Sequence, residues 1–299
     1  MAALVRHPNE LLRFDFKRES RSAPARAGDL AFRRFCTPRL SERRSSDHDL
    51  LTARARFHLR AAQWVRVATA AGEVQAYVLD PETARGPASS VLVVHGWTGE
   101  ASFMAVIAEQ IRRAGFRAVL FDCPAHGLSA GRRASLMDCS RAVLTVAETL
   151  GPIRFAVAHS MGCLAALLAG EGKPPLARAY PFERYVLISS PNRFSEVTQE
   201  FGRGLKLTRP AQRAYERQLE RIAHRTIGEF TGARLLAATA RPALLLHDRE
   251  DREVSFRNAE EIAAACPLAE LQASEGFGHR KILYAPPAVR AAVAYLTRP

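Results

Sequence analysis

The chain has 299 residues, 47% of them apolar, and a formal net charge of +13 at pH 7. This apolar fraction is ordinary for a globular protein that buries a core, and it excludes disorder throughout the chain. No run approaches the roughly eighteen apolar residues of a membrane-spanning helix, and charges interrupt the amino-terminal stretch too early for the apolar centre of a secretory signal.

These features predict a cytoplasmic protein. The cysteines are five in number and include no C-x-x-C pair, so neither a disulfide framework nor a zinc site is indicated. We expect buried thiols that behave as small hydrophobic side chains, and no metal or organic cofactor.

The positive charge is concentrated in two stretches of the chain. Residues 1–60 hold about half of the excess, and residues 191–241 form a second basic stretch. Such charge could attract nucleic acid, anionic lipid or an acidic substrate. Because the arginines are mixed with acidic residues and not with stacking aromatics, we favour a solvated surface. We therefore expect no nucleic-acid partner and leave peripheral contact with anionic lipid open.

The predicted elements divide the chain in two. Residues 1–61 show no clear period and are expected to form a basic extension with a short helix near residues 47–59. From residue 62, β-rich runs alternate with amphipathic helical stretches, which is typical of a mostly parallel sheet covered on both faces. A hairpin opens this region, and six further strands are predicted; the runs are 64–69, 74–80, 90–96, 117–123, 153–160, 184–190, 242–248 and 268–274.

The alternation predicts one α/β domain over residues 62–299, with one interruption. Residues 191–235 contain a basic amphipathic helix and are inserted between the sixth and seventh strands. An insertion there would lie like a lid over the carboxyl edge of the sheet, which is where open parallel sheets bind ligands.

Ser160 follows the predicted strand at 153–160 and is the first candidate for chemistry. A nucleophilic serine needs an exposed hydroxyl, a base, an acid that orients the base, and N–H groups for the oxyanion. A tight strand-to-helix turn would expose the hydroxyl, and it needs small residues two positions before and after it. Ala158 and Gly162 satisfy this rule, although the commoner motif G-x-S-x-G has glycine at both places. These five residues alone are weak evidence.

Five motifs that follow one another along the chain are stronger evidence than the residues around Ser160 alone. They are VVHGWTG (93–99), FDCPAHGLS (121–129), AHSMG (158–162), HDREDREV (247–254) and GFGHRKIL (276–283). In these motifs the sequence resembles the α/β-hydrolase superfamily over roughly residues 62–298, and within it the bacterial lysophospholipase- and monoacylglycerol-lipase-like serine hydrolases. The resemblance implies an α/β-hydrolase fold with a mostly parallel central sheet, helices on both faces and a small helical lid.

The resemblance also implies a catalytic triad in the chain order serine, acid, histidine. Ser160 would be the nucleophile, Asp251 the acid and His279 the general base. The family pattern His-Gly-x-x-Asp-x-x-Val aligns Asp251 with the acid and puts Asp248 where glycine usually stands. We therefore interpret Asp248 as a residue that shapes the loop.

Two backbone N–H groups complete the implied site. The family places an oxyanion-hole amide just after the His-Gly pair, which is Trp97 here, and the second directly after the nucleophile, which is Met161. One such donor is typically worth ~3 kcal/mol in the transition state. Because the backbone supplies both, the Trp97 side chain is expected to affect the shape of the pocket.

We expect four further histidines to have structural roles and not catalytic ones. We expect His95 to brace the oxyanion loop and His126 to bond within its own turn. Neighbouring side chains on a strand point to opposite faces, so His159 should not reach the Ser160 hydroxyl. His224 is expected on a solvated helix face, with substrate contact as the alternative.

The motif FDCPAHGLS contributes loop residues. Ala125 stands where glycine is commoner, and Asp122 and Ser129 are expected to fix a loop near the pocket. Arg132 and Arg133 follow this motif; we favour solvated charge over binding of an acidic substrate group.

The sequence thus predicts a serine hydrolase that cleaves carboxylic esters, lipid-like esters among them, through an acyl-enzyme intermediate. A thioesterase or an acyltransferase would use the same triad. The alternative outside the enzymes is a non-catalytic binding module with an α/β-hydrolase fold. The expected partner is a small-molecule ester, while acyl and alcohol specificity, the pose of the lid and the oligomeric state stay open.

Overall fold

The computed structural model describes residues 14–38, 57, 59–81 and 89–299. In this part of the chain, eight strands form one sheet in the order β1-β2-β4-β3-β5-β6-β7-β8. The strands are β1 (Gln63–Thr69), β2 (Gly72–Leu79), β3 (Ser90–Val94), β4 (Arg117–Phe121), β5 (Ile153–His159), β6 (Arg184–Ile188), β7 (Ala243–Asp248) and β8 (Ala269–Ser274). β2 pairs antiparallel with β1 and β4, and all other neighbours are parallel. The mostly parallel α/β sheet predicted from the sequence is confirmed.

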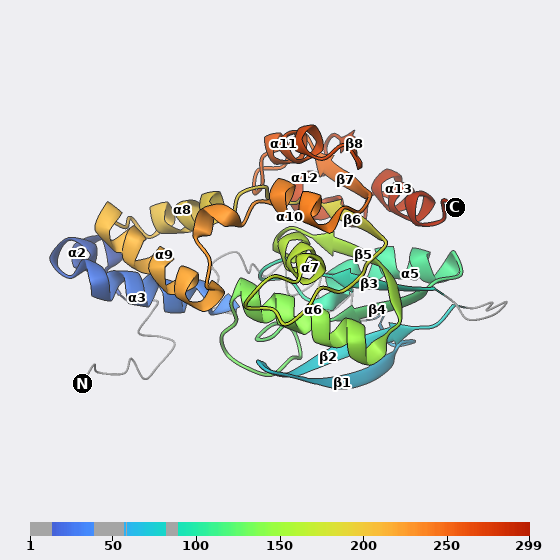
Figure 1. The fold of residues 1–299 in the computed structure, drawn as a ribbon, viewed down its shortest axis with the longest axis horizontal. Helices are drawn as coiled ribbons and strands as arrows, with labels where there is room; N and C mark the ends of the chain where they lie inside the picture. The colour runs from blue at the N-terminus through green and yellow to red at the C-terminus, as the bar shows by residue number, and fades with distance from the viewer. Residues whose placement is uncertain (1–13, 39–56, 58, 82–88) are drawn as a thin grey trace.

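Helices cover both faces of this sheet (Figure 1). The helices and short 3-10 turns of this body are η2 (Ala101–Met104), α5 (Ala105–Arg113), α6 (Leu136–Leu150), α7 (Met161–Glu171), η3 (Ile227–Glu229), α10 (Gly232–Thr239), α11 (Arg257–Ala265), α12 (Gly278–Lys281) and α13 (Pro286–Leu296). Along β3, Leu92 and Val94 join the apolar core beneath α6 and α7, while Val91 and Val93 join the core beneath α5 and α13. Both faces are buried, which explains why the parallel strands read as continuous apolar runs.

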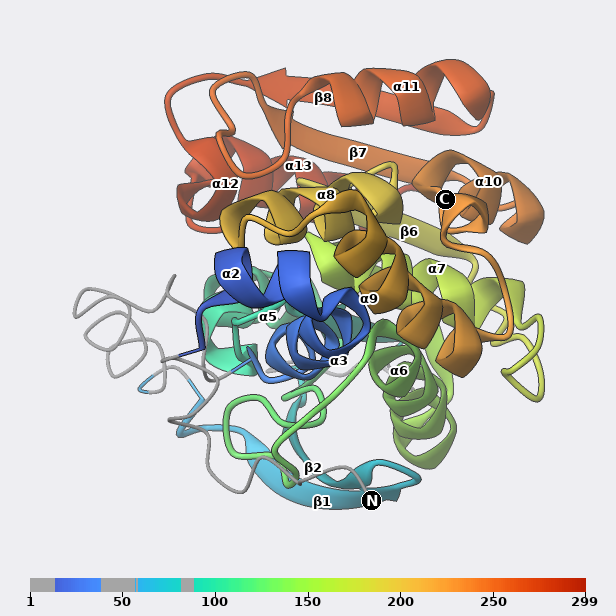
Figure 2. The ribbon, with the colours of Figure 1, turned by 90° about the vertical axis from the view of Figure 1, so that its left-hand side faces the viewer.

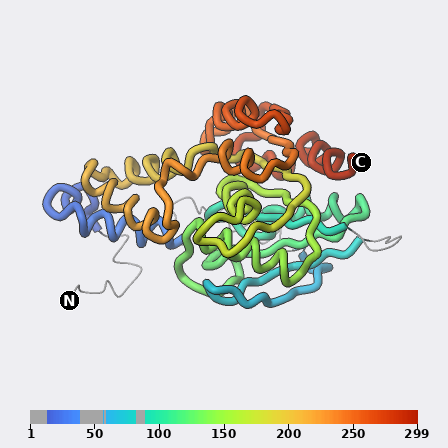
Figure 3. The backbone as a smooth tube through the Cα atoms, in the orientation of Figure 1, coloured from blue at the N-terminus to red at the C-terminus, as the bar shows by residue number. Residues whose placement is uncertain are grey.

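Four further helices lie together at one end of the molecule, beyond the sheet (Figure 2). They are α2 (Phe16–Ser22), α3 (Pro24–Phe35), α8 (Phe194–Gly204) and α9 (Arg209–Ala223), and we call them the outer layer. Segments far apart in the sequence meet here, because α3 comes from the amino-terminal part and lies alongside α9, and α2 packs against α3 (Figure 3). The predicted small helical lid is thus present as α8 and α9, joined by two helices that the sequence analysis did not predict.

The local sequence explains these two unexpected helices. Asp15 accepts a hydrogen bond from the amide of Arg18 at 3.0 Å and so caps α2, and Pro24 stands in the first turn of α3. The buried face of α3 repeats at helical spacing, with Ala27, Leu30, Ala31 and Phe35. The short helix expected near residues 47–59 falls almost wholly outside the described residues.

The chain between β6 and β7 divides between the outer layer and the body. α8 and α9 belong to the outer layer, whereas α10 packs against α7 and α11 of the body. The expected end of the lid near residue 235 therefore falls inside α10, and the division into 1–61 and 62–299 stays a prediction. No helix in the described ranges is long and apolar enough to cross a membrane.

Candidate active site

The predicted triad residues all follow the carboxyl ends of parallel strands. Ser160 comes directly after β5, Asp251 lies in the loop after β7, and His279 lies after β8 in α12. β3 pairs with β5 so that Val94 is opposite Ala158, which places the loop after β3 beside the turn after β5. The fold therefore gathers all five sequence motifs at one edge of the sheet.

Ser160 occupies a strained turn between β5 and α7. Its backbone has φ 53° and ψ −128°, a region that residues other than glycine rarely adopt. A Cβ atom on Gly162 would lie 2.4 Å from the carbonyl oxygen of His95, and one on Gly96 would lie 2.8 Å from Cβ of Ser160. This close approach explains the small residues, and the fully buried Ala158 is tolerated where the commoner motif has glycine.

The structure brings the three predicted triad side chains into one hydrogen-bonded chain. Nε2 of His279 lies 3.0 Å from Oγ of Ser160, and Nδ1 of His279 lies 2.8 Å from Oδ2 of Asp251. Asp251 and His279 are buried, whereas Ser160 is partly exposed. The imidazole thus has one nitrogen directed at the hydroxyl and the other held by the carboxylate.

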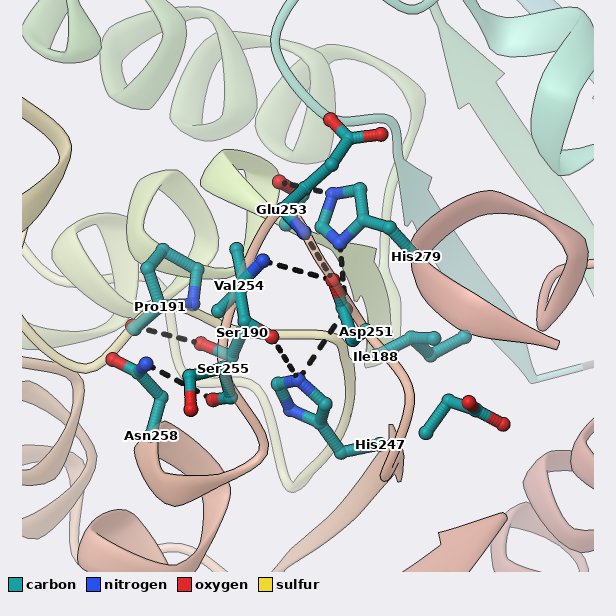
Figure 4. A network of polar contacts seen from close by, with 12 residues as sticks. Ile188, Ser190, Pro191, His247, Asp251, Glu253, Val254, Ser255, Asn258 and His279 are labelled. Carbon is teal, nitrogen blue, oxygen red and sulfur yellow. Dashed lines mark hydrogen bonds and ion pairs between the residues drawn. The ribbon is translucent and has the colours of Figure 1, made fainter. Parts of the chain in front are cut away.

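Asp251 lies between two imidazoles, those of His279 and His247 (Figure 4). Its Oδ1 accepts hydrogen bonds from the amides of Glu253 at 2.9 Å and Val254 at 2.8 Å. Burial alone would raise the pKa of Asp251, but the hydrogen bonds from His247 and His279 outweigh it and hold that pKa well below its usual range. The carboxylate is therefore ionised beside His279.

The sequence analysis missed His247 as a member of this network. Its Nε2 lies 2.8 Å from the carbonyl oxygen of Val254 and 3.3 Å from Oδ2 of Asp251. Nε2 faces a carbonyl oxygen and so carries the proton, and Nδ1 has no hydrogen-bond partner among the described residues. No sequence signal could have found this contact, because it depends on how the loop between His247 and Val254 folds back.

His159 is a second contact that was not predicted. Its Nε2 donates to the backbone carbonyl of His279 at 2.9 Å, and the two rings lie 4.7 Å apart. Burial, with a contribution from the nearby His279, lowers the pKa of His159 well below its usual value. A neutral His159 therefore supports the backbone of His279 and does not compete for the serine proton.

Among the other histidines in the described residues, His95 and His126 hold loops around the site and His224 lies away from it. The amide of Cys123 donates to Nε2 of His95 at 2.9 Å, and Nδ1 of His95 donates to the carbonyl oxygen of Gly96 at 2.7 Å. These two bonds give His95 the bracing role that was expected. His126 accepts from the amide of Thr98 at 3.3 Å. His224 ends α9 and is not among the residues that line the cavity at Ser160.

Two buried carboxylates shape loops, as expected. Asp122 accepts hydrogen bonds from the Tyr77 hydroxyl and from two backbone amides, and Ser129 donates to its carbonyl oxygen. Asp248 accepts from the Ser274 hydroxyl and from two amides of the loops after β7 and β8. Arg132 and Arg133 are exposed and do not line the cavity.

A cavity of about 620 Å³ opens over Ser160. Trp97 and Met161 line it, and within the described residues neither backbone N–H donates to a protein acceptor. Both amides are therefore available to a ligand beside the serine. In the same part of the chain, no group of three His, Cys, Asp or Glu side chains is arranged to hold a metal ion.

Solved structures share this fold at low sequence identity. A candidate lipase from Acinetobacter baumannii has a TM-score of 0.62 at 17% identity, covering 86% of this chain and 97% of its own. Est1E from Butyrivibrio proteoclasticus has a TM-score of 0.61 at 13% identity, covering 78% and 97%. A thioesterase domain from the curacin biosynthetic pathway has a TM-score of 0.57 at 14% identity, covering 80% and 100%.

A comparison with curated protein sequences gives no match. The family model described as the alpha/beta hydrolase family matches residues 91–296, which is most of the chain and includes Ser160, Asp251 and His279. The family match, the strand order and the loops at the carboxyl edge of the sheet all indicate the same α/β-hydrolase fold. The chain belongs to the alpha/beta hydrolase family, with the fold shared by lipase- and esterase-like members.

Proposed function

We propose that the protein is a serine hydrolase that cleaves carboxylic esters through an acyl-enzyme intermediate. The hydrogen-bonded chain from Ser160 through His279 to Asp251 carries this proposal, because its serine end opens into the cavity. The family is one of hydrolases, and the solved relatives include proteins described as an esterase and a thioesterase domain.

In the first step, Oγ of Ser160 attacks the ester carbonyl while Nε2 of His279 takes the hydroxyl proton. The ionised Asp251 holds Nδ1–H and stabilises the imidazolium that forms. The N–H groups of Trp97 and Met161 would then donate to the oxyanion, since both line the cavity beside the serine.

Collapse of the tetrahedral intermediate breaks the ester C–O bond, and His279 returns the proton to the departing alcohol. Water then attacks the acyl-serine with His279 again as base, which releases the acid and regenerates Ser160. The same acyl-enzyme would form from a thioester, so a thioesterase stays the second candidate, favoured by the shared fold of the curacin thioesterase domain.

Steady-state hydrolysis of p-nitrophenyl acetate and butyrate, and of the matching acyl thioesters, tests the proposal. Ser160→Ala should lower kcat/KM by about 10³-fold or more. Ser189→Ala is a matched control, because Ser189 follows the neighbouring strand β6 with φ 50° and its hydroxyl has no partner in the described residues. Hydrolysis by Ser160→Ala at the rate of Ser189→Ala would contradict the proposal.

A further inference from the structure

The cavity over Ser160 has a wall that the family match does not include. That match begins at residue 91, yet Phe14, Phe16 and Phe35 all line the cavity. On the adjoining side, Phe201 of α8 and Leu205 directly after it line the cavity as well. Two segments far apart in the sequence thus enclose the space above one serine.

The amino-terminal helices are fixed against the lid helices by close packing. A Cβ atom on Gly28 of α3 would lie 2.5 Å from Cβ of Ala214 and 2.7 Å from the carbonyl oxygen of Ala211, both in α9. The hydroxyl of Ser20 accepts from the amide of Thr208 at 2.6 Å and donates to its hydroxyl at 2.9 Å. The outer layer is therefore a single packed unit, and α2 and α3 are not a loose extension.

Aromatic side chains continue from this unit down to the reaction centre. Phe35 stacks on Trp97 with ring centroids 5.6 Å apart and an interplanar angle of 15°. It also meets Phe201 edge-on at 5.1 Å and Tyr215 at 5.6 Å. Phe14 packs edge-on against Phe16 at 4.8 Å. Phe35 therefore joins the loop that carries the proposed oxyanion donor to both lid helices.

The side chains of this wall determine which ligands it can bind. The phenylalanines and Leu205 offer dispersion contacts and loss of apolar surface to water. Charged side chains of the same two segments line the cavity as well: Asp15, Lys17, Arg34, Glu200 and Lys206. The volume of about 620 Å³ lies within the usual range of small-molecule pockets. A ligand with an extended apolar group fits such a wall, with its carbonyl at Ser160.

We propose that the amino-terminal helices and α8 together form the subsite for the apolar chain of the ester substrate, and that Phe14, Phe35 and Phe201 are specificity-determining residues. This inference rests on the proposed ester hydrolysis. Ser160, His279 and Asp251 are needed to cleave every ester, whereas the phenylalanines contact only substrates whose chain extends beyond the serine.

Two substrate series separate the acyl side from the alcohol side. In the first, p-nitrophenyl esters run from acetate to decanoate, and in the second, acetate esters run from ethanol to decanol. Wild type, Phe14→Ala and Phe35→Leu, which keeps an apolar side chain, are compared with Phe57→Ala as matched control, since Phe57 is 62% exposed and does not line the cavity. Thermal unfolding of each variant confirms that it is folded.

The subsite predicts that Phe14→Ala and Phe35→Leu lower kcat/KM for the longest chains about tenfold more than they lower it for the shortest esters. The series in which this difference appears identifies the chain that the subsite binds. Folded variants whose chain-length profiles run parallel to those of wild type and Phe57→Ala would overturn the subsite alone. A wild type that cleaves no ester in either series would overturn the proposed function and the subsite with it.

Discussion

The carboxyl edge of the sheet and the outer layer are built by different interactions. At the edge, buried hydrogen bonds hold the side chains of the proposed triad, including the two imidazoles on Asp251 and the contact from His159 to His279. In the outer layer, small residues let α3 and α9 approach, and aromatic rings fill the remaining space. The edge is thus suited to hold reacting groups at fixed distances, and the outer layer is suited to shape the space that a substrate enters.

Substitutions that affect only one of the two regions can separate their roles. Changes at the edge should lower turnover of every ester, and changes in the outer layer should act through stability or chain length. The expected effects are largest at the acid of the proposed triad.

Asp251→Asn should lower kcat/KM for every ester by about 10³- to 10⁴-fold, because an amide favours the wrong tautomer of His279 and no longer stabilises the imidazolium. Asp248→Asn is the matched control: Asp248 ends β7, directly before the loop that holds Asp251, but bonds to Ser274 and to backbone amides. We expect it to lower kcat/KM less than about tenfold. Equal losses in the two variants would remove Asp251 from its proposed role.

Gly28→Ala should lower the free energy of unfolding by about 1–3 kcal/mol, because the new methyl group meets the backbone of α9. Turnover of p-nitrophenyl acetate by the folded variant should stay within about threefold of wild type, since the triad geometry is unaffected. Gly228→Ala, where nothing lies within 4 Å of the added atom, should change stability by less than about 0.5 kcal/mol. Chemical denaturation measures the free energy of unfolding of both variants. Equal stability of the two would contradict the tight docking of α3.

His159→Phe should lower kcat about tenfold with little change in KM, because it removes the donor to the backbone of His279 and leaves that carbonyl unpaired. His159→Gln can restore an N–H near the same place, so it should retain more activity than His159→Phe. If the two variants were equally active at the wild-type level, the contact would have no positioning role.

The parts of the fold that could be predicted from the sequence are those with a strong local pattern. Apolar runs that end in glycine or polar residues predicted the strands, and the turn at Ser160 depends on neighbours at Ala158 and Gly162. The resemblance to the α/β-hydrolase superfamily selected Asp251 and His279 as candidates. The structure joins these two side chains to Ser160 by hydrogen bonds.

The outer layer was harder to predict for physical reasons. Ala27, Leu30, Ala31 and Phe35 carry a helical repeat, but the surrounding arginines and Gly28 in the middle of α3 weakened the signal. Gly28 is favourable only because α9 lies against it, and that contact joins residues far apart in the sequence. The amino-terminal wall of the cavity could not be predicted for the same reason: it forms only when α3 packs against helices that lie far away in the sequence.

Covalent labelling is the sharpest test of whether Ser160 is the nucleophile. Folded wild-type protein is treated with a fluorophosphonate, and the modified peptide is identified by mass spectrometry. We expect one adduct, on Ser160, and none in Ser160→Ala under the same conditions. An adduct on another residue, or hydrolysis of p-nitrophenyl esters that continues unchanged after Ser160 is fully modified, would contradict this assignment.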